Sequence, residues 1–277
     1  MLSIIIPSRN EEYLEKTITG LLDNCTGEIE ILPVLDGYSP PERNPDPRVK
    51  YIHHAVGVGM REAINSAVSV AKGEYLMKID AHCIIDKGLD EKLKSVHQPD
   101  WVQIPRRYNL DIENWCRGDK IVDYEHWIYP LKYNPPSLHG FRSQERAAER
   151  KDIIIDETMT FQGSCYFIAR KYWDELNLLK DDRYGTLPAQ EATYIGNTVW
   201  KAGGQVMTNK NTWYAHWFKG KEHGRGYFMD KGLQRDCYAF SYDHWLNENK
   251  EDFIKIIDKF MPIPDWPKDY KQRLWTA

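Results

Sequence analysis

Residues 73–83 read Gly-Glu-Tyr-Leu-Met-Lys-Ile-Asp-Ala-His-Cys, a short apolar strand that runs into an Asp-x-His pair. Residues two apart on an extended segment project from the same face, so Asp80 and His82 can point together at one ion beyond the end of the strand. A carboxylate oxygen and an imidazole nitrogen suit Mn²⁺, Zn²⁺ or Fe²⁺, whereas Ca²⁺ and Mg²⁺ favour all-oxygen shells. The pair alone also fits a solvated acid beside a packed histidine, so the metal hypothesis depends on the rest of the chain.

The segments before this strand alternate between apolar strands and amphipathic helices. The first strand is a continuous β-branched run, which is typical of a strand buried on both faces of a parallel sheet. Asn10 is expected to cap the first helix, with Glu11 and Glu12 in its first turn. The pattern predicts an α/β fold with a mostly parallel central sheet flanked by helices and with ligands at the carboxyl ends of the strands. The expected strands are 2–7, 30–35, 49–52 and 74–79, and the expected helices are 11–24 and 60–72.

Composition indicates a globular protein of one or two domains. The chain has 277 residues, of which 42% are hydrophobic and 13% aromatic, and its net charge of -4 does not suggest general affinity for nucleic acids. Five scattered cysteines without a CxxC spacing fit reduced thiols. No apolar run approaches the roughly 18 residues of a membrane span, and no basic segment precedes the first strand. We therefore expect a soluble, cytoplasmic protein.

Two other classes of α/β protein lack their motifs here. A dinucleotide-binding fold would carry G-x-G-x-x-G after the first strand, but Gly57-Val58-Gly59 has no third glycine and follows the third strand. A nucleotidyltransferase usually has a glycine-rich phosphate loop after the first strand, and Pro7-Ser8-Arg9-Asn10 is not such a loop.

Several motifs in a fixed order resemble those of glycosyltransferases with the GT-A fold, the Rossmann-like fold of nucleotide-diphospho-sugar transferases. The similarity covers roughly residues 1–90 and 158–220, and the Asp-x-His-Cys form is most similar to the polypeptide N-acetylgalactosaminyltransferases, a branch related to the broad family 2 group. The motifs are Ile4-Ile5-Ile6-Pro7-Ser8-Arg9-Asn10-Glu11, Val34-Leu35-Asp36-Gly37, Gly59-Met60-Arg61-Glu62-Ala63-Ile64-Asn65, Ala71-Lys72-Gly73-Glu74-Tyr75-Leu76, Asp80-Ala81-His82-Cys83, Gly163 to Trp173, and Glu191 followed by Val199-Trp200-Lys201-Ala202-Gly203-Gly204.

The resemblance implies a site for a nucleotide sugar, in particular a UDP-sugar. It assigns the uracil ring to Asp36, places Pro7 and Arg9 at the nucleotide, and brings Arg61 near the nucleotide or its phosphates. It also implies that Mn²⁺, or another divalent cation, bridges the donor's diphosphate. The ligands of that ion would be Asp80, His82 and His216.

The residues after His216 gain a possible role from this interpretation. Glycines and cations alternate there, and such a loop can close over a diphosphate and exclude water. Lys219, Lys221 and Arg225 are therefore candidates for phosphate contacts, provided that the metal site exists. Without the metal motif, the same segment would be an ordinary charged surface loop.

Glu191 matches the acidic residue near the reaction centre in the resembled family. Inverting family 2 enzymes usually have Glu-Asp there, with the aspartate as general base, but this chain has Glu191-Ala192. Either Glu191 is the base or transfer is retaining and has no dedicated base, and we favour retention. A solvated acid at a helix N-terminus would also account for this residue.

The expected domains are a catalytic domain at 1–226 and a C-terminal helical extension at 227–277 that packs on it or forms a dimer contact. An insertion at about 101–156 combines aromatic residues with Arg142, Arg146 and Arg150, at a place where family 2 enzymes build acceptor specificity. The candidate acceptors are a saccharide, a protein, or hydroxylated bases of phage DNA. The resembled enzymes have a membrane anchor and a lectin domain. We expect neither in this protein, and we therefore expect a bacterial or phage enzyme. The alternative is a catalytically silent protein that binds sugar nucleotides or carbohydrates.

Overall fold

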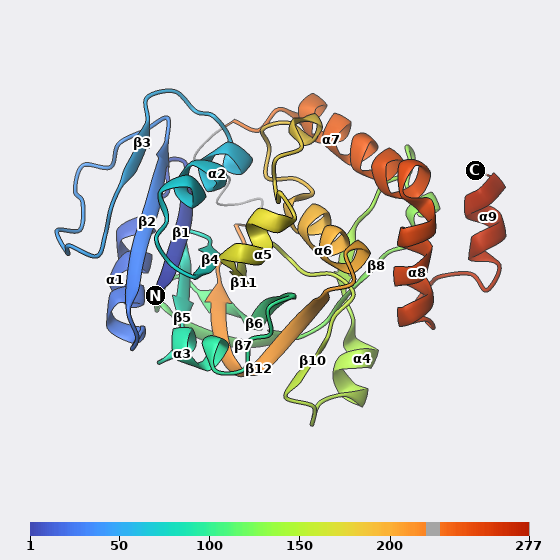
Figure 1. Cartoon of the computed structure of the whole chain (residues 1–277), viewed down its shortest axis with the longest axis horizontal. Coiled ribbons are helices and arrows are strands. Elements are labelled where there is room, and N and C mark those ends of the chain that lie inside the picture. Colours follow the sequence, from blue (N-terminus) through green and yellow to red (C-terminus); the bar gives the residue numbers. More distant parts are fainter. Residues whose placement is uncertain (220–227, 277) are drawn as a thin grey trace.

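The computed structural model describes residues 1–219 and 228–276, which form a central mixed sheet with helices on both faces (Figure 1). In one half of the sheet, β4, β1, β2 and β3 lie side by side and are all parallel. Every residue of β1 is buried, as expected for a β-branched strand covered on both faces. These strands are β1 (Leu2–Ser8), β2 (Ile29–Asp36), β3 (Ile52–His54) and β4 (Tyr75–Ile79).

The other half of the sheet is mixed. β11 joins the two halves because it runs antiparallel to both β4 and β6, and β6 is parallel to β12. β5 and β10 pair with β12, β7 pairs with β6, and β8 and β9 form a separate ribbon. These strands are β5 (Cys83–Ile85), β6 (Trp101–Asp111), β7 (Cys116–Val122), β8 (Glu125–Trp127), β9 (Gly140–Arg142), β10 (Ile155–Glu157), β11 (Cys165–Ala169) and β12 (Gln205–His216).

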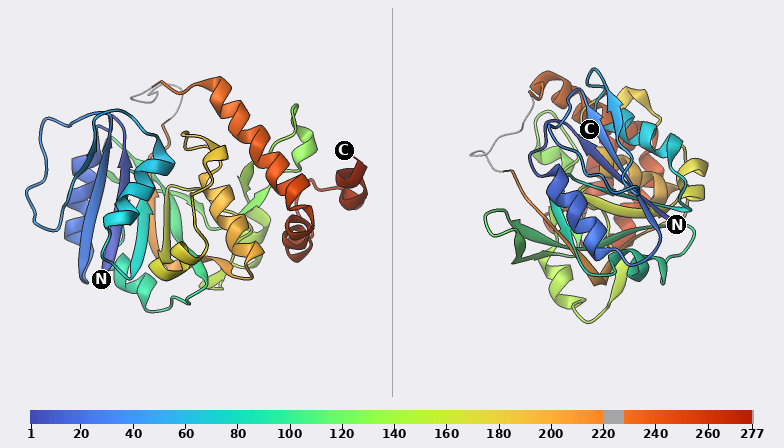
Figure 2. Two further views of the ribbon diagram at one scale, coloured as in Figure 1. Left: turned by 45° about the horizontal axis from the view of Figure 1, so that its top comes forward. Right: turned by 90° about the vertical axis from the view of Figure 1, so that its left-hand side faces the viewer.

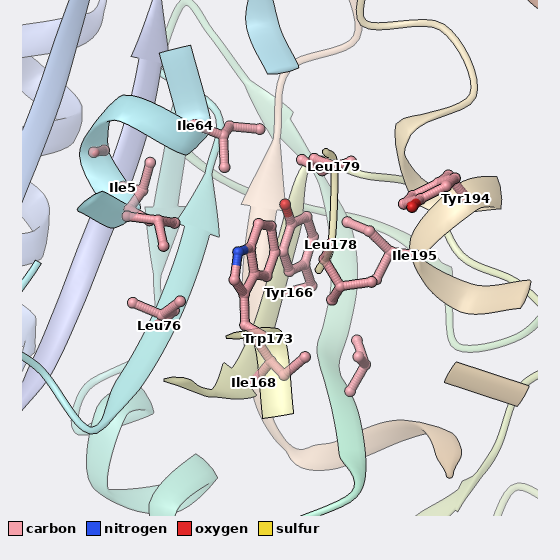
Figure 3. Packing of buried hydrophobic residues seen from close by; sticks show 14 of the residues in the cluster. Ile5, Ile64, Leu76, Tyr166, Ile168, Trp173, Leu178, Leu179, Tyr194 and Ile195 are labelled. Carbon is pink, nitrogen blue, oxygen red and sulfur yellow. The ribbon is translucent and has the colours of Figure 1, made fainter. Parts of the chain in front are cut away.

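The two faces of the sheet bury two separate apolar clusters. Side chains alternate along a strand, so Ile5 of β1 faces the cluster with α2, α5 and α6, which Figure 3 shows in part, whereas Ile4 and Ile6 face the cluster with α1 and α3. The helices are α1 (Leu14–Asn24), α2 (Met60–Val70), α3 (Leu89–Lys94), α4 (Gln144–Glu149), α5 (Arg170–Glu175), α6 (Glu191–Lys201), α7 (Lys231–Asp243), α8 (Lys250–Phe260) and α9 (Tyr270–Thr276), with short helical turns at 130–132, 182–184 and 244–248.

Three sequence-based expectations differ from the structure. Asn10 does not cap α1, because it has a positive φ of 54° and the helix begins only at Leu14. The third strand is formed by 52–54 rather than 49–52, since Val49 makes only an isolated bridge to Ile31. Finally, the segment expected to be an insertion begins with β6, which is an interior strand of the main sheet.

The C-terminal helices pack on the segment between β7 and β10. They lie at the opposite end of the molecule from β2 and β3 (Figures 1 and 2). Trp245, Phe253 and Trp266 form a third apolar cluster with Trp127 and Tyr129. The indole Nε1 of Trp266 also donates a hydrogen bond of 2.6 Å to the carbonyl oxygen of Trp127. Two aromatic residues of the expected acceptor-side insertion, Trp127 and Tyr129, are therefore buried against the C-terminal helices.

Candidate active site

A cavity of about 320 Å³ opens where the parallel strands β1, β2 and β4 end. Open α/β sheets bind ligands at this edge, because the loops after the strands leave a crevice there. The cavity collects most of the predicted site residues from segments that are far apart in the sequence. Among its lining residues are Pro7, Arg9, Glu11, Asp36, Lys78, Asp80, His82, Gln162, Glu191, His216 and Lys219.

Asp80, His82 and His216 converge on one point of this cavity. Antiparallel pairing of β12 with β5 sets His216 opposite Cys83, beside the Asp-x-His pair. His216 Nε2 lies 3.2 Å from Asp80 Oδ2 and 3.1 Å from His82 Nε2. One candidate ligand atom from each residue lies within 4.8 Å of the others. This is the donor set of one carboxylate and two imidazoles expected for a transition-metal site.

The protonation of this group suits a cation. Burial lowers the pKa of His216 to about 4, so its imidazole is neutral near pH 7 and has a lone pair to offer. Burial alone would raise the pKa of Asp80, but Lys78 and then His216 hold it well below its usual range. A neutral imidazole and an ionised carboxylate are the forms that bind metal ions.

Lys78 contacts Asp80, one of the three candidate ligands, and was not expected in the site. Its side chain is only 2% exposed, and its Nζ donates 2.6 Å hydrogen bonds to Asp80 Oδ1 and to the carbonyl oxygen of Gly163. The same Nζ lies 3.5 Å from Glu191 Oε2. The sequence held a signal for this lysine, because it precedes Asp80 by two positions on a strand and so shares its face.

Glu11 is a second residue that the sequence-based prediction missed. The positive φ at Asn10 keeps Glu11 out of α1, and its Oε2 lies 3.1 Å from His82 Nδ1. Its Oε1 accepts a 2.7 Å hydrogen bond from Lys219. Although burial opposes the effect, His82 and Lys219 hold the pKa of Glu11 below its ordinary value. A carboxylate on the far nitrogen of a ligating histidine fixes the orientation of the ring and its tautomer.

Of the residues predicted to bind the nucleotide, some line the cavity and others do not. Asp36 lines the cavity and accepts hydrogen bonds from the backbone N–H groups of Val58 (2.6 Å) and Gly59 (3.1 Å), with Arg9 at 4.0 Å. Arg61 does not line the cavity. Instead it is buried against the ring of Tyr184, 4.7 Å from the ring centroid, and donates to the carbonyl oxygen of Ala189. Lys221 and Arg225 lie outside the described residues.

Glu191 begins α6 on the wall between the first cavity and a larger one of about 890 Å³. Its side chain is 4% exposed, and its Oε1 accepts a 2.8 Å hydrogen bond from the hydroxyl of Tyr166. Burial raises the pKa of Glu191 above its usual range, although Lys78 opposes the shift. The side chain is therefore not the solvated helix-start acid that the sequence also allowed.

Residues 3–175 match the model of the family described as glycosyl transferase family 2. The chain belongs to this family. The family 2 match covers more than half of the chain and includes Asp36 at the end of β2 and the connection between β4 and β5 that carries Asp80 and His82. The resemblance based on the motifs is thereby confirmed.

Relatives of this family 2 glycosyltransferase include polypeptide N-acetylgalactosaminyltransferases. Polypeptide N-acetylgalactosaminyltransferase 12 of Mus musculus is 22% identical over 273 residues, which cover 90% of this chain and 44% of the relative. Glycosyltransferase GlyG of Streptococcus pneumoniae is 31% identical over 121 residues, 40% of either chain. This chain thus spans about half the length of the curated relatives that it matches, or less.

Solved structures show the same fold. The crystal structure of GalNAc-T7 with UDP, GalNAc and Mn²⁺ superposes with a TM-score of 0.72 at 16% identity, over all of this chain and 54% of the other. The structure of S. aureus TarS 1–349 in complex with UDP-GlcNAc has a TM-score of 0.57 at 14% identity, over 99% and 78% of the two chains. The predicted GT-A architecture is confirmed.

Within residues 1–219 and 228–276, no helix combines the length and apolar character that a membrane span requires.

Proposed function

We propose that this family 2 glycosyltransferase transfers a sugar from a UDP-sugar and that it depends on Mn²⁺ or a similar divalent cation. The convergence of Asp80, His82 and His216 is the observation that carries the proposal. Two imidazoles and one carboxylate fit such an ion, and three protein ligands leave positions for phosphate oxygens. The GalNAc-T7 structure with UDP, GalNAc and Mn²⁺ supports this choice of donor and ion.

In this proposal, Asp80, His82 and His216 hold the ion while Glu11 orients His82. When bound, the ion would act as a Lewis acid that neutralises the leaving diphosphate. The uracil ring contacts Asp36, with Pro7 and Arg9 beside the nucleotide. Lys219 contacts a phosphate by exchanging its bond to Glu11 for one to the donor, since ammonium groups bind phosphate as point charges.

Glu191 is the catalytic candidate because it lies where the two cavities meet. Both of its oxygens face partners, since Oε1 accepts from Tyr166 and Oε2 lies near Lys78. A carboxylate held in this way is better suited to positioning a sugar than to removing a proton, so we favour retaining transfer without a dedicated base. The 890 Å³ cavity is the proposed acceptor side, and a saccharide, a protein or hydroxylated DNA bases remain the candidate acceptors.

Nucleotide binding tests the proposal directly. Thermal unfolding is measured with UDP or GDP, each with and without Mn²⁺. A ligand at a hundred times its dissociation constant stabilises the native state by about 2.7 kcal/mol, which gives a clear shift. We expect stabilisation by UDP that requires Mn²⁺, and its loss in Asp80→Ala. Equal stabilisation with and without Mn²⁺ would contradict the metal site, and no response to either nucleotide would favour a silent carbohydrate-binding protein.

A further inference from the structure

Gln162 lies on the wall that separates the two cavities and lines both of them. It belongs to the segment that leads into β11, immediately before Gly163, whose carbonyl oxygen binds Lys78. Glu191 lies on the same wall. Neither the donor motifs nor the candidate metal ligands include this glutamine.

The side-chain amide of Gln162 is held in one orientation. Its Oε1 accepts a 2.7 Å hydrogen bond from Arg107 Nη1 and a 2.8 Å hydrogen bond from Ser164 Oγ. A guanidinium can only donate, so the atom facing Arg107 has to be the oxygen rather than the nitrogen. The two donors are fixed in turn, because Glu125 binds Arg107 at 2.6 Å and the hydroxyl of Tyr214 lies 2.7 Å from Ser164 Oγ.

This arrangement leaves the amide nitrogen available. An amide nitrogen can donate two hydrogen bonds, and among the described residues none accepts from Gln162 Nε2. The side chain is only partly exposed, and both cavities lie against it. A pre-oriented donor on a cavity wall is therefore suited to recognising an oxygen atom of a ligand.

We propose that Gln162 is a specificity-determining residue whose Nε2 donates a hydrogen bond to an oxygen of the sugar being transferred. The inference rests on the proposed function and deepens it. The nucleotide end of the donor is assigned to Asp36 and the diphosphate to the Asp80 side, so the sugar lies between the ion and Glu191, along the wall formed by Gln162. Both a hydroxyl oxygen and an acetamido carbonyl oxygen accept such a bond.

Two substitutions at Gln162 distinguish a contact with a sugar hydroxyl from a contact with an acetamido carbonyl. Gln162→Glu keeps the bonds from Arg107 and Ser164 but replaces the donor with a group that only accepts. Gln162→Met keeps the length of the side chain and removes all of its hydrogen bonding. A hydroxyl of the sugar can donate to the new carboxylate, whereas an acetamido carbonyl cannot. Gln98→Met, an exposed position before β6, is the matched control.

The measurement is calorimetric binding of UDP, UDP-glucose, UDP-GlcNAc and UDP-GalNAc in the presence of Mn²⁺. The readout is the dissociation constant of each UDP-sugar divided by that of UDP. This ratio is insensitive to changes that affect binding of the nucleotide part alone. One lost hydrogen bond to a ligand lowers affinity by about tenfold. We expect Gln162→Met to raise this ratio about tenfold for the preferred sugar, with UDP affinity nearly unchanged, and Gln98→Met to leave it as in the wild type.

The response of Gln162→Glu identifies the oxygen. A raised ratio for the acetamido sugars alone assigns the contact to the acetamido carbonyl, and a ratio restored toward the wild type assigns it to a hydroxyl. Wild-type ratios in both Gln162 variants would overturn this inference while leaving the proposed function intact. A wild-type protein that binds neither UDP nor any UDP-sugar would instead overturn the proposed function, and this inference with it.

Discussion

Replacement of Lys78 by methionine would leave the buried carboxylate of Glu191 and the partly buried carboxylate of Asp80, which is 18% exposed, without their shared cation. The ammonium group is 2.6 Å from Asp80 and 3.5 Å from Glu191, and the lysine and glutamate side chains are 2% and 4% exposed. Removing one member of a buried ion pair costs about 3–5 kcal/mol, because the remaining charge is desolvated without compensation. We expect Lys78→Met to lower the free energy of unfolding by about this amount at pH 7.5.

The loss should depend on pH in a defined direction. In the wild type, Lys78 holds the pKa of Asp80 below its unfolded value. The carboxylate therefore contributes stability at neutral pH that is lost as the pH falls through the folded pKa. In Lys78→Met, burial is no longer opposed by this cation, so the pKa of Asp80 rises. The deficit relative to the wild type should then be largest at pH 7.5 and shrink as the pH falls and this carboxyl protonates.

Urea denaturation of the wild type, Lys78→Met, Asp80→Asn and the double variant measures both effects. Because Asp80→Asn removes the stranded charge, the double variant should be more stable than the sum of the single changes predicts. Lys180→Met, which removes an exposed lysine, is the control and should change stability little. Additive single changes, or a loss in Lys78→Met below about 1 kcal/mol at every pH, would refute the reasoning.

Two further predictions concern a positioning residue and acid stability. Glu11→Gln weakens the bond that orients His82, so Mn²⁺ affinity measured by calorimetry should fall about 10- to 100-fold. Glu12→Gln, at the neighbouring exposed position, is the control and should leave the affinity unchanged. Equal affinities in the two variants would show that Glu11 does not belong to the site. Burial lowers the pKa of His97 from 6.5 to about 4. Between these two pH values the unfolded chain binds one proton more than the folded chain at this residue. The free energy of unfolding should therefore decrease as the pH is lowered from 6.5 to about 4. His97→Gln should reduce that slope in urea denaturation, and an unchanged slope would contradict this assignment.

The parts of the fold that were predicted correctly are encoded locally. The continuous apolar run of β1 and the spacing of Leu14, Ile18 and Leu21 define their elements without distant partners. The Asp-x-His pair is likewise local, because Asp80 and His82 lie two residues apart in the short connection between β4 and β5. His216, by contrast, was assigned only through the family resemblance, and the structure brings it to the pair by pairing β12 with β5.

The unpredicted parts depend on contacts between distant segments. β6 was assigned to an insertion because its interior position depends on pairing with β11 and β12, which lie more than 50 residues further along the chain. Glu11 was assigned to a helix start because helix propensity does not reveal the positive φ at Asn10. Arg61 was expected at the nucleotide, but its guanidinium is buried against Tyr184. Its contact with the nucleotide stays a prediction.

The most direct measurement is electron paramagnetic resonance of Mn²⁺ titrated into the protein with and without UDP. The account predicts one Mn²⁺ site per chain whose affinity increases when UDP is present, because the phosphate oxygens complete the shell begun by Asp80, His82 and His216. His216→Ala should weaken this site strongly. An Mn²⁺ affinity that is the same in His216→Ala as in the wild type, or that does not respond to UDP, would contradict the claim that these three residues form the donor's metal site.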